Sequence, residues 1–193
     1  MKHSLLHESA RRHYEHFQNA YHSYGHACEV YKVVADNDAK WAVQLAAVWH
    51  DAIYIPGAPN GINEEMSAWA LTQAWTDHSN LPVLHEACRL IGGTSVDNHL
   101  MRVNLPMCGQ ALLLDADLFS LASNYDEFVA RQSLIHLENS LQPNTKGSRS
   151  RTANFLSVFL NVRPNIYHVL TQYEQKAREN IQRYCDETYS MKS

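Results

Sequence analysis

Apolar positions recur along most of the chain with a spacing of three to four residues, which predicts helices almost throughout. Alternating runs of β-branched residues bounded by tight turns do not appear, so no strand is expected. Only residues 103–108 are ambiguous. The predicted helices cover residues 4–17, 26–34, 41–53, a segment beginning at 63, 82–92, 110–122, 125–139, 151–160 and 166–188. The predicted class is therefore all-α.

The predicted helix over 41–53 is the most apolar segment of the chain. A loop with two prolines and two glycines follows it at 56–61. Asn63 is then expected to cap the next helix, with Glu64 and Glu65 in its first turn, where the helix dipole favours negative charge.

The length of 193 residues suits one domain with a substantial core and is short for two. Neither an internal repeat nor a linker is visible. We expect a single helical bundle over 1–193, in which about 21–120 form a core and helices within 125–190 complete the bundle.

Composition excludes several classes of protein. The net charge of -4 argues against general nucleic-acid binding, which needs a basic surface. The first twelve residues lack an apolar signal region, and no apolar stretch is long enough to span a membrane. The 4 cysteines are scattered without a CxxC pair, which fits reduced thiols and excludes a zinc ribbon. The expected location is the cytoplasm, without membrane association.

The adjacent pair His50-Asp51 lies at the end of the apolar segment. In a chain with 12 histidines such a pair is close to a chance event, so its surroundings matter more than its occurrence. An ionised carboxylate buried among apolar side chains is costly unless it is paired or bound to a metal. A helix end that simply emerges into solvent explains the pair about equally well.

Two further segments favour a metal site. Tyr21-His22-Ser23-Tyr24-Gly25-His26 lies upstream, and a pair of acids, Asp115 and Asp117, interrupts a second apolar helical run downstream. A histidine, the His-Asp pair and a distant aspartate on separate helices form a four-ligand set that can hold a divalent ion and leave positions open for water and substrate. The spacing alone leaves Asp115 and Asp117 as competitors, since side chains two apart on a helix point differently.

In this order, the pattern His26…His50-Asp51…Asp117 resembles the signature of the HD-domain metal-dependent phosphohydrolase superfamily, and more narrowly an uncharacterised bacterial branch of predicted hydrolases. The matching pieces are Tyr21-His22-x-x-x-His26, His50-Asp51-Ala52-x-Tyr54, Asn63-Glu64-Glu65-x-Ser67-Ala68, Asp115-Ala116-Asp117-Leu118, Ile166-Tyr167 and Glu174-x-x-Ala177-Arg178-x-Asn180. The resemblance implies His26, His50, Asp51 and Asp117 as metal ligands. It departs from many nucleotide-processing members at Tyr54, where they have a glutamate.

Other side chains are weaker candidates for the site. Either Asp51 or Glu65 can orient or deprotonate a water, although glutamates at a helix start are more often solvated. Candidates for contacts to a ligand or to the metal's neighbours are His22, Tyr54, Glu64, His99, Asp115, Arg131 and Arg151, with Lys146 and Arg149 as further basic residues that can meet phosphate.

The resemblance implies a metal-dependent phosphohydrolase that acts on a small phosphate ester such as a nucleotide. Two imidazoles and two carboxylates suit Mn, Fe, Co, Ni or Zn better than Mg. The alternatives are a non-catalytic helical binding or regulatory module, with a homodimer as one assembly, and a di-iron oxygenase on the same scaffold. The oxygenase would need additional histidines, for which His78, His85 and His99 are the candidates.

Overall fold

Helix α3 (Trp41–Trp49) lies at the centre of the larger group of helices and is almost wholly buried. The computed structural model describes residues 2–15, 19–76, 78–101, 108–140, 149–161 and 164–190, with backbone alone for 2–6, 78, 100, 101 and 108. Within them the helices are α1 (Lys2–His13), α2 (Tyr24–Asp36), α3, α4 (Ile62–Ala74), α5 (Leu81–Gly92), α6 (Val96–Met101), α7 (Cys108–Asp117), α8 (Tyr125–Ser140), α9 (Arg149–Asn161) and α10 (Glu174–Ser190), with short 3-10 helices η1 (His78–Asn80), η2 (Phe119–Ala122) and η3 (Thr171–Tyr173).

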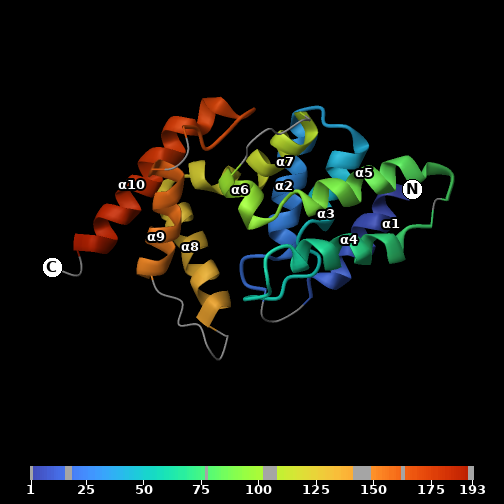
Figure 1. Cartoon of the computed structure of the whole chain (residues 1–193), viewed down its shortest axis with the longest axis horizontal. Helices are drawn as coiled ribbons and strands as arrows, with labels where there is room; N and C mark the ends of the chain where they lie inside the picture. Colours follow the sequence, from blue (N-terminus) through green and yellow to red (C-terminus); the bar gives the residue numbers. More distant parts are fainter. Residues whose placement is uncertain are drawn as a thin grey trace.

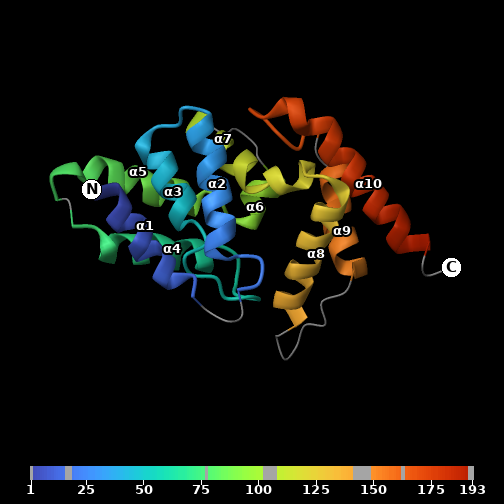
Figure 2. The same cartoon turned by 180° about the vertical axis from the view of Figure 1, so that it is seen from behind.

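The helices fall into two neighbouring groups that share one hydrophobic core. Helices α1 to α5 gather at one end, α8 to α10 at the other, and α6 and α7 lie between them (Figures 1 and 2). In the first group α3 packs against α2, α5 and α7, and in the second α10 packs against α9 and η2. The all-α prediction is confirmed, since the described residues contain no strand.

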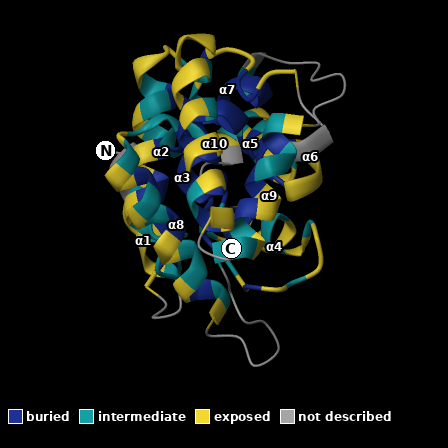
Figure 3. Ribbon diagram, turned by 90° about the vertical axis from the view of Figure 1, so that its left-hand side faces the viewer, coloured by how far each residue is buried: buried dark blue, intermediate teal, exposed yellow. Residues whose placement is uncertain are grey.

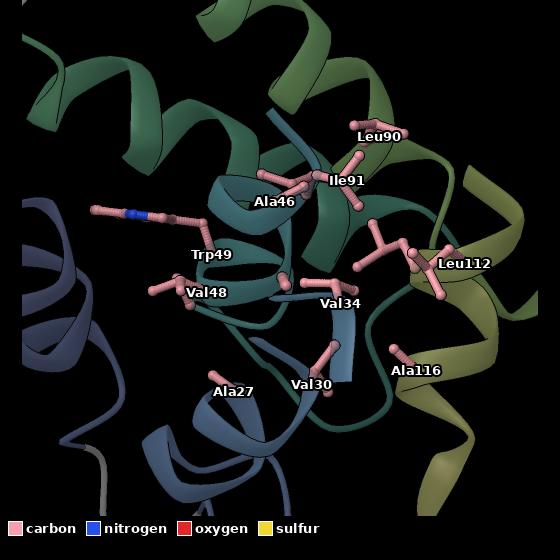
Figure 4. Close-up of a cluster of buried hydrophobic side chains, with 14 of the residues drawn as sticks. Ala27, Val30, Val34, Ala46, Val48, Trp49, Leu90, Ile91, Leu112 and Ala116 are labelled. Atoms are coloured by element: carbon pink, nitrogen blue, oxygen red, sulfur yellow. The ribbon is translucent and has the colours of Figure 1, made fainter. Parts of the chain in front are cut away.

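The sequence of α3 explains its place in the core. Seven of its nine side chains are apolar and buried, so a helix of this composition is stable only when other elements cover it on several sides. Figure 3, in which the ribbon is coloured by burial, shows buried residues inside the bundle and exposed ones on its outer faces. The residues around α3 are Val30 and Val34 of α2, Leu90 and Ile91 of α5, and Leu112 and Ala116 of α7 (Figure 4).

The predicted helix over 41–53 ends earlier, at Trp49. His50 Nδ1 donates a hydrogen bond to the carbonyl of Ala47, the group that the backbone N–H of Asp51 would use to continue the helix. The chain instead tightens into a turn in which Ala52 N–H bonds to Trp49 O. His50 is therefore the C-cap of α3 and Asp51 follows it in the turn, so the predicted extent of this helix to residue 53 is wrong.

The helix expected to start at Asn63 begins at Ile62, with Gly61 as its N-cap at φ 88°. Asn63 is therefore not the cap. Its side chain forms hydrogen bonds with the N–H and the carbonyl of Ile55, which fixes the preceding loop. Glu64 and Glu65 lie in the first turn as predicted.

Two other predicted helices are interrupted. The segment 110–122 divides into α7 and η2, where the side chain of Tyr167 donates to Leu118 O and that of Asn180 donates to Leu121 O. Residues 166–170 are not helical, because side chains rather than helical carbonyls accept their backbone N–H groups. The ambiguous residues 103–107 lie outside the described part of the chain.

No described helix combines the length and apolar character needed to cross a membrane.

Candidate metal centre

Four side chains from separate parts of the sequence meet between α2, α3 and α7. His26 comes from the first turn of α2, His50 and Asp51 from the turn after α3, and Asp117 from the last position of α7. One ligand atom from each lies within 4.8 Å of those of all the others. Packing of three helices, rather than any local motif, creates the group.

The distances within this group are short. His26 Nε2 lies 2.9 Å from Asp117 Oδ1 and 3.7 Å from Asp51 Oδ2. His50 Nε2 lies 3.0 Å from Asp51 Oδ2 and 3.3 Å from Asp117 Oδ1. Both imidazoles are buried, whereas the carboxylates retain 15% and 17% side-chain exposure. The carboxylates therefore form the side of the group that a water or a substrate can reach.

The ring of His50 is oriented for a metal. Its Nδ1 donates to the carbonyl of Ala47 at 2.9 Å, because a carbonyl can only accept. In the neutral ring the lone pair is therefore on Nε2, a buried atom without a hydrogen-bond partner that faces two carboxylate oxygens. Such an arrangement is unfavourable unless a positive charge lies between these atoms. Histidines that bind metals commonly donate their other ring nitrogen to a backbone carbonyl in this way.

The electrostatics of the group also favour positive charge. Burial opposes protonation of His50, but the charges of Asp51 and Asp117 outweigh it and raise its pKa well above the ordinary value. Burial likewise disfavours the charged form of Asp117, yet His50 and hydrogen bonds from His26 and other histidines hold its pKa well below the usual range. Burial opposes ionisation of Asp51 too, but the charges of His50 and His22 together outweigh it and lower the pKa of Asp51, so both carboxylates stay ionised and attract a cation.

This group can hold a metal ion, as its two imidazole nitrogens and two carboxylates match the ligand types of divalent transition metals.

Asp115 is a structural residue of α7. It is fully buried, and its Oδ2 accepts the backbone N–H groups of His168, Val169 and Leu170 at 2.6 to 3.0 Å. The sequence left Asp115 and Asp117 as competitors, and the structure brings Asp117 alone of the two into the metal group.

His99 contacts the group from α6. Its Nε2 lies 2.9 Å from Asp117 Oδ2, the oxygen not used by His26. It therefore orients this carboxylate. Of the other histidines considered for a second metal, His85 is exposed on α5, and the side chain of His78 lies outside the described part.

His22 lies in the bend before α2 beside the group. Its ring stacks on Tyr54 with centroids 3.6 Å apart, and its Nδ1 lies 2.7 Å from Glu138 Oε2. Burial lowers the pKa of His22, but Asp51 and Glu138 more than offset this and raise it. The ring is thus held in a fixed orientation at the edge of the centre.

Sequence reasoning missed Glu138. This α8 residue is 1% exposed, and its Oε1 accepts the backbone N–H groups of Tyr21 and His22. Glu138 therefore fixes the segment that carries His22. Only a weak pattern in the sequence could have indicated that Glu138 is buried. Gln132 and Glu138 are polar residues on the same buried face of α8 as Phe128.

The remaining candidates lie further out. Glu65 is exposed, whereas Glu64 is half-buried, and burial together with the charge of Asp51 raises the pKa of Glu64. The guanidinium of Arg131 forms a two-bond ion pair with Glu29 at 2.6 and 2.9 Å and also binds Glu127, so it is held by carboxylates. Arg151 is exposed on α9 and lines a cavity next to the centre. Arg149 binds Glu187, and Lys146 lies outside the described residues.

Two cavities adjoin the centre. One, of about 520 Å³, is lined by His26 and Asp117 together with the Arg131 ion pair. The other, of about 410 Å³, is lined by Asp117, His99, His22 and residues of α8 and α9. Asp117 thus borders both spaces, which gives the metal group access to molecules larger than water.

Comparisons of the chain with models of protein families, with curated proteins and with solved structures found no match.

Proposed function

We propose that this protein is a metal-dependent phosphohydrolase that cleaves phosphate esters of small metabolites. The observation that carries the proposal is the partnerless Nε2 of buried His50, which faces the carboxylates of Asp51 and Asp117, and Asp117 lines two cavities. The pattern His26…His50-Asp51…Asp117 resembles the HD-domain signature, and this resemblance is the reason for proposing hydrolysis of a phosphate ester. The expectation of a nucleotide substrate comes from the same resemblance.

In this proposal His26, His50, Asp51 and Asp117 hold one divalent ion, for which Mn, Fe, Co, Ni and Zn are the expected metals. Such an ion would lower the pKa of a coordinated water and neutralise charge that develops on the phosphoryl oxygens.

The chain's own residues would then orient the reactants. His99 and His26 fix the two oxygens of Asp117, which leaves Asp51 as the more adaptable carboxylate. Asp51 can accept a proton from water through the oxygen that is not turned toward the histidines. Glu64 is half-buried, and burial together with the charge of Asp51 raises its pKa, whereas Glu65 is exposed.

The test is elemental analysis of protein purified without chelator, followed by a phosphatase screen with each of the five metals. We expect about one ion per chain and phosphate release from at least one class of ester. Asp51→Asn is expected to lower kcat at least a hundredfold. Asp97→Asn, which changes an exposed aspartate of α6, is the matched control and should leave activity within twofold. Phosphate release that persists in Asp51→Asn would refute the proposal.

A further inference from the structure

The cavity of about 410 Å³ is continuous with the metal centre, which makes it the place for the part of a substrate beyond its phosphate. Its lining joins Asp117 and His22 of the centre to Ile135 of α8 and Leu156 and Phe159 of α9. A phosphate that reaches Asp117 would therefore place its ester group between these elements. Cavities of this size commonly hold small organic ligands.

Most of the cavity's surface away from the centre is apolar. Leu156, Phe159 and Leu121 are buried, with at most 5% exposure. An apolar group gains free energy when it leaves water for such a surface. The apolar lining residues are Val96, Leu118, Leu121, Ile135, Phe155, Leu156 and Phe159.

The polar side chains in the same walls mostly bind one another or the backbone. Asn139 donates to Ile135 O at 2.9 Å, and Thr152 Oγ1 lies 2.5 Å from His136 Nε2. Tyr21 and Ser120 share a hydrogen bond of 3.2 Å between their hydroxyl groups. These groups have limited capacity to satisfy a ligand with many polar atoms.

Gln132 and His99 differ from these residues. Gln132 is 3% exposed and lines the cavity, where its amide can donate and accept hydrogen bonds. His99 lines it too, and its buried Nδ1 has no hydrogen-bond partner among the described residues. A buried polar atom without a partner costs free energy, which a ligand with a matching donor or acceptor can recover. The wall therefore offers a few hydrogen-bonding positions within a mostly apolar surface.

The lining of the cavity reaches the protein surface at residues of α6 and α9. Val96 and Phe155 line it and are 48% and 43% exposed. Arg151 also lines this region and is exposed, so a positive charge stands where an anionic ester would enter.

From these features we infer that the cavity binds a mostly apolar, ring-bearing group with few hydrogen-bonding substituents, attached to the phosphate that the centre cleaves. The inference rests on the proposed function and narrows its substrate class. Water attacks phosphorus, the bond from phosphorus to the ester oxygen breaks, and the products are inorganic phosphate and the alcohol, whose oxygen takes the proton.

A nucleoside fits this cavity poorly. Its ribose hydroxyls and its base carry many donors and acceptors, and most would lie against Ile135, Leu156 or Phe159 without a partner. An aryl alcohol has an apolar ring and few such groups.

The first experiment compares two alcohols as ligands, so that it depends on neither metal nor catalysis. Calorimetry on the unaltered chain in the presence of a chelator measures the binding of 1-naphthol and of adenosine. We expect 1-naphthol to bind at least tenfold more tightly. With metal restored, kcat/KM for 1-naphthyl phosphate should exceed that for adenosine monophosphate at least tenfold.

A matched pair of variants locates the binding. Ile135→Trp fills the cavity from α8, while Leu137→Trp adds the same bulk at a position on α8 that is 49% exposed. We expect Ile135→Trp to weaken 1-naphthol binding at least tenfold and Leu137→Trp to change it less than twofold. Circular dichroism checks that both variants fold. If one does not, the comparison of 1-naphthol with adenosine on the unaltered chain still tests the inference.

The outcomes separate the two proposals. Adenosine binding as tight as that of 1-naphthol, or equal binding in Ile135→Trp and the unaltered chain, overturns the apolar ligand class. Cavity-dependent binding of 1-naphthol without turnover of any ester supports that ligand class and refutes the hydrolase function.

Discussion

Asp115 and Asp117 lie two residues apart at the end of α7, yet their carboxylates bind different parts of the chain. Asp115 accepts three backbone N–H groups from residues 168–170, while Asp117 contacts His26 and His99. Since side chains two apart on a helix point about 200° from each other, one helix turn both anchors the C-terminal segment and supplies the metal group.

Asp115→Ala should destabilise the fold without changing the metal group. Three buried N–H groups would lose their acceptor, and each costs about 1 kcal/mol or more, so the free energy of unfolding should fall by about 3 kcal/mol. Urea denaturation followed by circular dichroism measures this change. Asp117→Asn is the paired variant: it should lose metal but remain folded, and equal metal loss in both variants would contradict the separation.

His50→Gln should lower metal affinity about a hundredfold or more, because it removes a ligand whose orientation the Ala47 carbonyl fixes. His85→Gln, at an exposed position of α5, is the control and should bind metal like the unaltered chain. Competition with a chromophoric chelator measures both. Equal affinities would show that the ion binds elsewhere.

Metal affinity should rise with pH through the neutral range. In the metal-free chain the pKa of His50 is raised, so near neutrality its ring holds a proton that the metal must displace. Each unit of pH below that raised pKa should therefore weaken binding about tenfold, and the dependence should level off above it. Calorimetry in buffers of different ionisation enthalpy measures the proton released, and pH-independent affinity would contradict this linkage.

Glu138→Gln should lower turnover more than it lowers metal content. The amide oxygen can still accept the N–H groups of Tyr21 and His22, but the amide nitrogen cannot accept from His22 Nδ1 as the carboxylate does. The ring of His22 would then lose its fixed orientation. We expect kcat to fall about tenfold or more with metal content unchanged. Asp126→Asn, at an exposed position on the same helix, should retain full activity.

Periodicity predicted most helices because the apolar faces that produce it also form the core. The errors occurred where a side chain captures a backbone group: His50 ends α3, and Glu174 and Asp115 keep residues 166–170 out of a helix. Such bonds depend on tertiary packing, so a local pattern cannot show them.

The candidate site was only partly predictable for the same reason. The order of His26, His50, Asp51 and Asp117 indicated a ligand set, and the structure brings these four together. Glu138 contacts residues more than 110 positions away, and its local sequence gives only a weak indication that it is buried and not solvated.

His26 and Asp117 are 91 positions apart in sequence, with the His50-Asp51 turn between them. Bringing such distant residues together in an unfolded chain carries a large loop-closure entropy, so the site forms only after α2, α3 and α7 have packed. An ion bound there would act as a removable cross-link that favours the native state over the unfolded one. Resistance to proteolysis would then report how fully the centre is loaded.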